Sequence, residues 1–191
     1  MPNHPKATAK AATISRLKIV LLSLFLLLGA AAFAQASANS KAVVNQYIDN
    51  AALVGEGRLT YIFWDVYDAS LYAPKGEWSY DKPFALTLHY LRDFEGADIA
   101  NLSIKSIRKL GFDNEVKLAT WHTQLNEIFP NVGNGNEMTG VYQPSGATSF
   151  YKDGQKIGVV KDTEFGEWFF DIWLSEKTER KELRKEVLGL K

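Results

Sequence analysis

A single arginine stands in a segment that otherwise has the composition of a buried strand. The segment GEGRLTYIFWDVYDASLYAP, from Gly55 to Pro74, is rich in aromatic and apolar residues, and Arg58 is its only basic side chain. A buried guanidinium needs a carboxylate of the protein or an incoming anion as its partner. Its planar group can donate two parallel hydrogen bonds to a carboxylate or another oxyanion. Three roles are open: an exposed charge at a sheet edge, an ion pair with Asp65 or Asp68, or a clamp for an anionic ligand.

The sequence offers few residues for other kinds of site. Beyond residue 36 its histidines are His89 and His122, which lie on different predicted elements and lack a carboxylate at metal-site spacing. We expect His122, on an apolar helix face, to be a hydrogen-bonded core residue. There is no nucleophile elbow, and GNGNEMTG lacks the lysine and the helix start of a phosphate-binding loop. The sequence therefore predicts neither a metal ion nor a cofactor.

The first 36 residues have the pattern of a secretory signal peptide. Four basic residues precede an apolar run at positions 19–34, and AAFAQASA then supplies two small-x-small cleavage patterns. The run is shorter than the roughly 20 residues that span a bilayer, so we expect no membrane anchor after cleavage. We therefore predict a periplasmic protein.

Residues 37–191 are predicted to form a single domain. None of the 22 acidic and four of the 22 basic residues lie before position 37, so this part carries a net charge near −4. A negative net charge argues against nucleic acid as a partner. The sequence has no cysteine, so the domain must be stable without disulfides.

The order of predicted elements indicates an α+β domain. Residues 43–48 could form a first strand or a helical turn. Aromatic and β-branched residues, with turn signals between them, predict strands at 53–64, 66–72, 84–91, 138–143, 147–152 and 156–161. Apolar residues at helical spacing predict helices at 99–110, ended by Gly111, at 114–129 with Asp113 as N-cap, at 163–174 and at 178–188. This order favours an antiparallel sheet with helices packed on one face.

Four segments, in this order, resemble the chalcone isomerase superfamily and in particular its bacterial exported chalcone isomerase-like branch. They are GEGRL...WDVYDASLYAP, SIRKLGF, YKDGQKIG and FFDIWLSEKTERKELRKEVLG, and the similarity covers residues 54–190. The resemblance implies an open-faced β-sandwich, a large antiparallel sheet with helices on one face. It also implies that Arg58 and Tyr67 line the ligand cleft. Their separation of nine residues requires a turn or a bulge between them, because they would face opposite ways on one regular strand.

The same resemblance implies that two hydroxyl groups of the enzymes are absent. A catalytic tyrosine aligns with Phe112, and a threonine aligns with Ile172. In the enzymes such groups hold the oxyanion of a flavonoid precursor during ring closure, and losing one donor of this kind lowers a rate roughly 10²–10³-fold. We therefore expect Arg58, Tyr67, Phe112 and Ile172 to line a ligand-binding site rather than a catalytic one.

The leading hypothesis is a periplasmic protein that binds a small apolar anion, such as a fatty acid. Arg58 and Tyr67 would hold the head group, and the tail would lie against the sheet and the aromatic helix. One alternative is an isomerase or lyase that acts on a phenolic enone similar to a chalcone. A second alternative is an envelope interaction module without a cleft, in which the charged terminal helix contacts a protein partner.

Overall fold

The computed structural model describes residues 38–144 and 146–190, which belong to one compact unit. The predicted signal peptide, residues 1–36, lies outside the described residues. No helix in the described part of the chain is long and apolar enough to cross a membrane.

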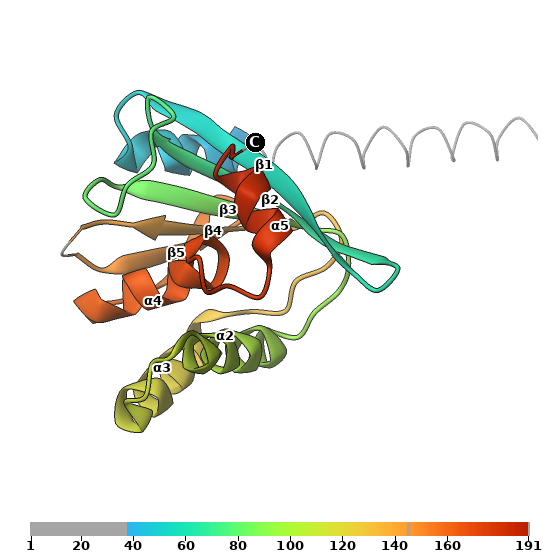
Figure 1. Ribbon diagram of the computed structural model, residues 1–191, viewed down its shortest axis with the longest axis vertical. Coiled ribbons are helices and arrows are strands. Elements are labelled where there is room, and N and C mark those ends of the chain that lie inside the picture. Colours follow the sequence, from blue (N-terminus) through green and yellow to red (C-terminus); the bar gives the residue numbers. More distant parts are fainter. Residues whose placement is uncertain (1–37, 145, 191) are drawn as a thin grey trace, which may run out of the picture. The chain divides into compact units, whose positions relative to one another are not determined.

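Six antiparallel strands form one sheet in which each strand pairs with its neighbours in the sequence (Figure 1). They are β1 (Ala51–Tyr61), β2 (Trp64–Pro74), β3 (Phe84–Tyr90), β4 (Glu137–Tyr142), β5 (Thr148–Lys152) and β6 (Gln155–Val160). The six predicted strands are confirmed. The main difference is that the β1–β2 turn lies at Ile62 and Phe63, inside the segment predicted to be strand up to residue 64.

Four helices lie on one face of the sheet (Figure 1): α2 (Gly96–Leu110), α3 (Glu115–Ile128), α4 (Thr163–Leu174) and α5 (Lys181–Val187). Gly111 ends α2 with a φ of 112°, as predicted. Asn114 and not Asp113 is the N-cap of α3, because its side chain accepts a hydrogen bond from the Lys117 backbone N–H. Helix α5 begins later than predicted because the hydroxyl of Thr178 donates to the carbonyl of Ile172 at the end of α4.

The main hydrophobic core lies between these helices and the sheet. Residues 38–47 form a further helix, which packs through a smaller cluster against the opposite face. Strand alternation explains the separation, because Phe84 and Leu86 enter the main core whereas Ala85 between them enters the smaller cluster. The predicted α+β fold with a large antiparallel sheet is confirmed, and the main helices pack on one face as predicted, whereas the 38–47 helix packs on the other face.

Candidate ligand-binding pocket

A cavity of about 540 Å³ lies between the covered face of the sheet, helix α2 and helix α4. Volumes of roughly 300–1,000 Å³ are typical of small-molecule sites. Most of its wall is apolar and comes from the sheet, from α2, from α4 and from the segments next to them: Leu59, Val66, Leu86, Leu88, Phe94, Ile99, Leu102, Phe129, Met138, Phe150, Phe169, Phe170, Ile172 and Trp173. The cavity can therefore hold a ligand with a sizeable apolar body.

The sheet builds its wall of the pocket by strand alternation. Strand β3 contributes Leu86, Leu88 and Tyr90 to the pocket. Thr87, which lies between Leu86 and Leu88, points to the other face, where its hydroxyl forms a hydrogen bond of 2.9 Å with the hydroxyl of Thr139. On β4, Gly140 leaves room for an aromatic ring of α4. A Cβ at this position would lie 3.0 Å from Phe170 Cζ, so the missing side chain allows close packing here.

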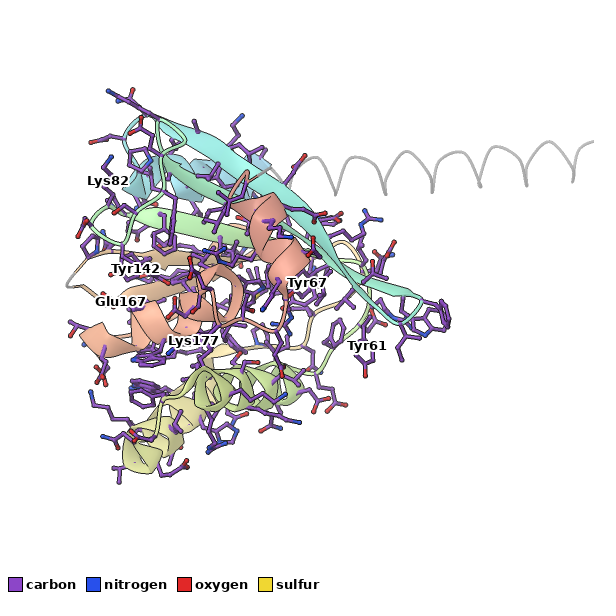
Figure 2. All side chains as sticks on the ribbon, viewed as in Figure 1. Tyr61, Tyr67, Lys82, Tyr142, Glu167 and Lys177 are labelled. Carbon is purple, nitrogen blue, oxygen red and sulfur yellow. The ribbon has the colours of Figure 1, made fainter. Side chains whose placement is uncertain are left out.

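Two tyrosine hydroxyls supply polar groups within the apolar wall. The Tyr67 hydroxyl accepts a hydrogen bond of 2.9 Å from Trp173 Nε1–H, and Figure 2 shows Tyr67 inside the body of the domain. The Tyr67 and Tyr90 rings meet edge to face, with centroids 6.0 Å apart. Burial raises the pKa of both hydroxyls, and the positive charge of Arg180 partly opposes that shift. Both hydroxyls therefore keep their protons at neutral pH and can donate to an anion.

Three cations also line the pocket: Lys105 and Lys109 on α2, and Arg180 just before α5. Lys109 donates to both carboxylate oxygens of Glu179, at 2.8 and 2.9 Å. Lys109 lowers the pKa of Glu179, and Arg180 and Lys105 contribute further. Within the described residues, no carboxylate forms a salt bridge with Arg180 or Lys105. Arg180 is thus a partly buried guanidinium without a fixed carboxylate partner.

Arg58 lies on the opposite face of the sheet from Tyr67. In the β1–β2 register Arg58 faces Asp68 and Leu59 faces Tyr67, so Arg58 points away from the pocket. Its Nε and Nη2 donate to the two Asp68 oxygens at 2.6 and 2.8 Å, and its Nη1 donates to Asp65 at 2.9 Å. These bonds raise the pKa of the guanidinium. Of the three roles left open by the sequence, the structure shows the ion pair.

The prediction that Arg58 and Tyr67 share one cleft is therefore wrong. A turn does lie between them, but in the hairpin Tyr67 falls opposite Leu59, so Arg58 and Tyr67 keep opposite orientations. Phe112 also lies outside the pocket lining, because its ring stacks on Trp121 at 4.7 Å in the core. Of the four predicted site residues, the pocket brings together Tyr67 and Ile172.

His89 and His122, the two histidines among the described residues, lie apart from the pocket lining. His122 makes the expected hydrogen-bonding contacts, with its Nε2 2.7 Å from the Asn101 side chain and 3.1 Å from that of Asn126, but it is only partly buried and is not the core residue that the sequence predicted. His89 lies 3.5 Å from Glu137 on the other face of the sheet. Among the described residues, no group of three or more histidine or acidic side chains could hold a metal ion.

Sequence reasoning missed Arg180 and Tyr90. Arg180 belongs to the charged run EKTERKELRKE, which has the composition of a solvated helix, and no local signal separates it from its neighbours. Tyr90 had a usable signal, because it continues the alternation of Phe84, Leu86 and Leu88 on β3.

Comparison with known proteins agrees with this architecture. A family model described as chalcone isomerase-like matches residues 31–189. Among solved structures, a fatty-acid binding protein of Arabidopsis thaliana superposes with a TM-score of 0.57 at 16% sequence identity, over 73% of this chain and 87% of that one. At this identity the likeness shows a shared fold. No curated protein matches the sequence.

Proposed function

The chain belongs to the chalcone isomerase-like family, and we propose that it binds a small apolar anion, such as a fatty acid, without converting it. The pocket carries this proposal, because its apolar wall is combined with two protonated tyrosines and with Arg180 and Lys105, neither of which forms a salt bridge among the described residues. The structural neighbour from Arabidopsis thaliana is a fatty-acid binding protein, which supports the same ligand class.

The size of the expected interactions is compatible with useful affinity. Burial of ten methylenes contributes on the order of 8 kcal/mol before ordering costs. A charge-assisted hydrogen bond to the carboxylate adds roughly 1.5–3 kcal/mol. Micromolar binding needs about 8 kcal/mol in total. The apolar tail therefore supplies most of the affinity, and the head group adds selectivity for an anion.

We assign the carboxylate contact to Arg180 rather than to Arg58. Arg180 lines the pocket, and its charge acts on the hydroxyls of both Tyr67 and Tyr90, so the three groups can converge on one head group. An anion at Arg58 would instead have to compete with Asp65 and Asp68 on the other face of the sheet. Lys105, which also lacks a salt bridge among the described residues, adds positive charge to the same pocket.

Binding without catalysis is supported by the two aligned positions that lack a hydroxyl. Phe112 lies in the core, and Ile172 presents an apolar side chain to the pocket. Neither can donate a hydrogen bond to a developing oxyanion. Export to the periplasm is part of the same proposal and is supported by the pattern of residues 1–36.

Native mass spectrometry of residues 37–191, purified from a bacterial periplasm, tests the proposal. We expect a bound fatty acid that can be extracted and identified. Ser106 is partly buried on α2 and lines the pocket, so Ser106→Trp should obstruct the cavity and weaken ligand binding. Ala119→Trp is the matched control, because Ala119 is exposed on α3 outside the lining. A parent that stays empty even after incubation with palmitate contradicts the proposal.

A further inference from the structure

The turn between β1 and β2 presents four consecutive large apolar or aromatic side chains to solvent. We call Tyr61, Ile62, Phe63 and Trp64 the hairpin tip. Their exposed fractions are 69%, 67%, 89% and 60%. Apolar side chains that are exposed singly need no explanation, but a contiguous group of this kind marks an interaction site.

The hairpin tip projects beyond the rest of the sheet. Strand β2 pairs with β3 only from Tyr67 onward, and the Val66 carbonyl accepts one further backbone hydrogen bond from the Leu91 N–H at 3.0 Å. Figure 1 shows the end of the hairpin beyond this point standing clear of the domain. Figure 2 shows Tyr61 near the same end. The hairpin tip would therefore contact a binding surface before the rest of this side of the domain does.

Polar contacts hold the projecting hairpin in place. Arg58 bridges to Asp65 and Asp68 across the two strands, and Thr60 donates to Asp65 at 2.8 Å. Arg92 lies over the Trp64 ring, 4.4 Å from its centroid. These contacts fix the base of the hairpin, so the apolar side chains of the tip remain exposed.

The backbone of the turn does not favour these residues. Ile62 has a φ of 59°, a left-handed conformation that a β-branched residue rarely adopts. Two-residue hairpins with this conformation at their first central position normally have glycine there. Ile62 is therefore disfavoured both by its exposure to water and by its backbone conformation. Its presence in the turn points to a role other than stabilising the fold.

The hairpin tip also adjoins the pocket. Tyr61 belongs to the tip and lines the pocket together with Leu59 of the same strand. Leu102, which is 52% exposed, and Lys105 line the pocket from α2. Exposed apolar side chains and Lys105, which forms no salt bridge among the described residues, thus lie at one side of the pocket.

We propose that the hairpin tip inserts into the interfacial layer of an anionic lipid bilayer and brings the pocket opening to the membrane surface. Trp and Tyr favour the membrane–water interface, and apolar side chains flanked by Lys and Arg bind anionic lipid surfaces. This inference goes beyond the proposed ligand, because insertion of the tip does not depend on what the pocket holds.

The shape of the tip favours a bilayer over a protein partner. Stable protein–protein interfaces bury at least about 1,000 Å² and need a complementary surface of some 20–30 residues a side. A projecting turn of four residues offers far less than that. A bilayer needs no matching shape, and a narrow apolar projection can enter it directly.

Vesicle binding by residues 37–191, whose described part belongs to one compact unit, tests this proposal. The probe is vesicles of phosphatidylethanolamine and phosphatidylglycerol at 3:1, with sedimentation and tryptophan quenching by brominated lipid as readouts. The variant Ile62→Gly/Phe63→Asn keeps the hairpin with residues that suit its turn and should stay folded. We expect it to bind at least tenfold more weakly than the parent. The control Val116→Ser removes an equally exposed apolar side chain on α3 and should bind like the parent.

Three results would overturn the proposal. The first is unchanged vesicle binding by the hairpin variant. The second is equal loss of binding in Val116→Ser. The third is a parent that ignores vesicles and forms a dimer that the hairpin variant disrupts, since the tip would then be a protein interface. Palmitate affinity measured without vesicles separates this proposal from the proposed function. A parent that binds vesicles but not palmitate supports tip insertion and contradicts the ligand.

Discussion

Replacing Arg180 with alanine removes the guanidinium to which we assign the ligand carboxylate. The fold should tolerate the change, because the contacts that fix this position are made by its backbone. The Arg180 N–H donates to the Thr178 hydroxyl at 3.1 Å, and its carbonyl accepts from the Arg184 N–H at 2.9 Å. A change in ligand affinity therefore reports on the side chain.

The expected loss follows from the type of bond. A hydrogen bond to a charged group contributes roughly 1.5–3 kcal/mol, and each 1.4 kcal/mol is a factor of ten, so palmitate should bind about 10- to 150-fold more weakly. Lys105 lines the same pocket and can neutralise part of the ligand's negative charge when Arg180 is absent. We therefore expect a loss of palmitate affinity near the tenfold end of this range.

Isothermal titration with palmitate and with hexadecanol isolates the head-group contribution. The two ligands share a tail, so the parent should prefer palmitate, and Arg180→Ala should lose that preference while retaining its affinity for hexadecanol. The matched control is Arg58→Ala, because Arg58 lies on the other face and is held by Asp65 and Asp68. We expect it to change palmitate affinity less than twofold.

The opposite pattern would refute the assignment. If Arg58→Ala weakened palmitate binding at least tenfold and Arg180→Ala had no effect, Arg58 would hold the anion, as the sequence analysis predicted. Equal losses for palmitate and hexadecanol in Arg180→Ala would show that the side chain shapes the pocket and does not bind the head group.

Further predictions concern the elements that build the pocket, and urea unfolding checks each. Tyr67→Phe leaves the buried Trp173 Nε1–H without its acceptor and should cost about 1–3 kcal/mol; an unchanged free energy of unfolding would contradict this. Gly55→Ala places a Cβ 2.2 Å from the Glu186 carbonyl oxygen in α5 and should destabilise by about 1–3 kcal/mol unless α5 shifts without cost. Asp162 is the N-cap of α4, and although burial opposes ionisation, hydrogen bonds including that from Trp121 lower its pKa below 3.8. The ionised carboxylate therefore stabilises the fold above about pH 4, and this stabilisation is lost as the pH falls through the folded-state pKa. Asp162→Asn should thus lower the free energy of unfolding by less at pH 3 than at pH 7. A loss of the same size at both pH values would contradict this prediction.

Local signals predicted most of the sheet and helices. The Asp153-Gly154 pair predicted the β5–β6 hairpin, and both residues have positive φ. Helix α4 has the predicted bounds because Asp162 caps its first turn and its apolar residues recur at helical spacing. The β1–β2 turn was missed because Ile62 and Phe63 carry no turn signal and have the composition of a strand.

The pocket was less predictable because it depends on which face each side chain takes. Cross-strand register decides that Tyr67 enters the pocket and Arg58 does not, and register is a property of the strand pair. Arg180 reaches the pocket because the chain between α4 and α5 turns back over the sheet, held by the Thr178 bond to Ile172. Neither arrangement has a local sequence signal.

The position of the ligand can be seen in a crystal structure of residues 37–191 with palmitate. We expect density for the acyl chain between the sheet and helices α2 and α4, with the carboxylate within hydrogen-bond distance of Arg180 and of the Tyr67 or Tyr90 hydroxyl. Palmitate bound beside Arg58 on the outer face, or a pocket that stays empty at saturating ligand, would contradict it.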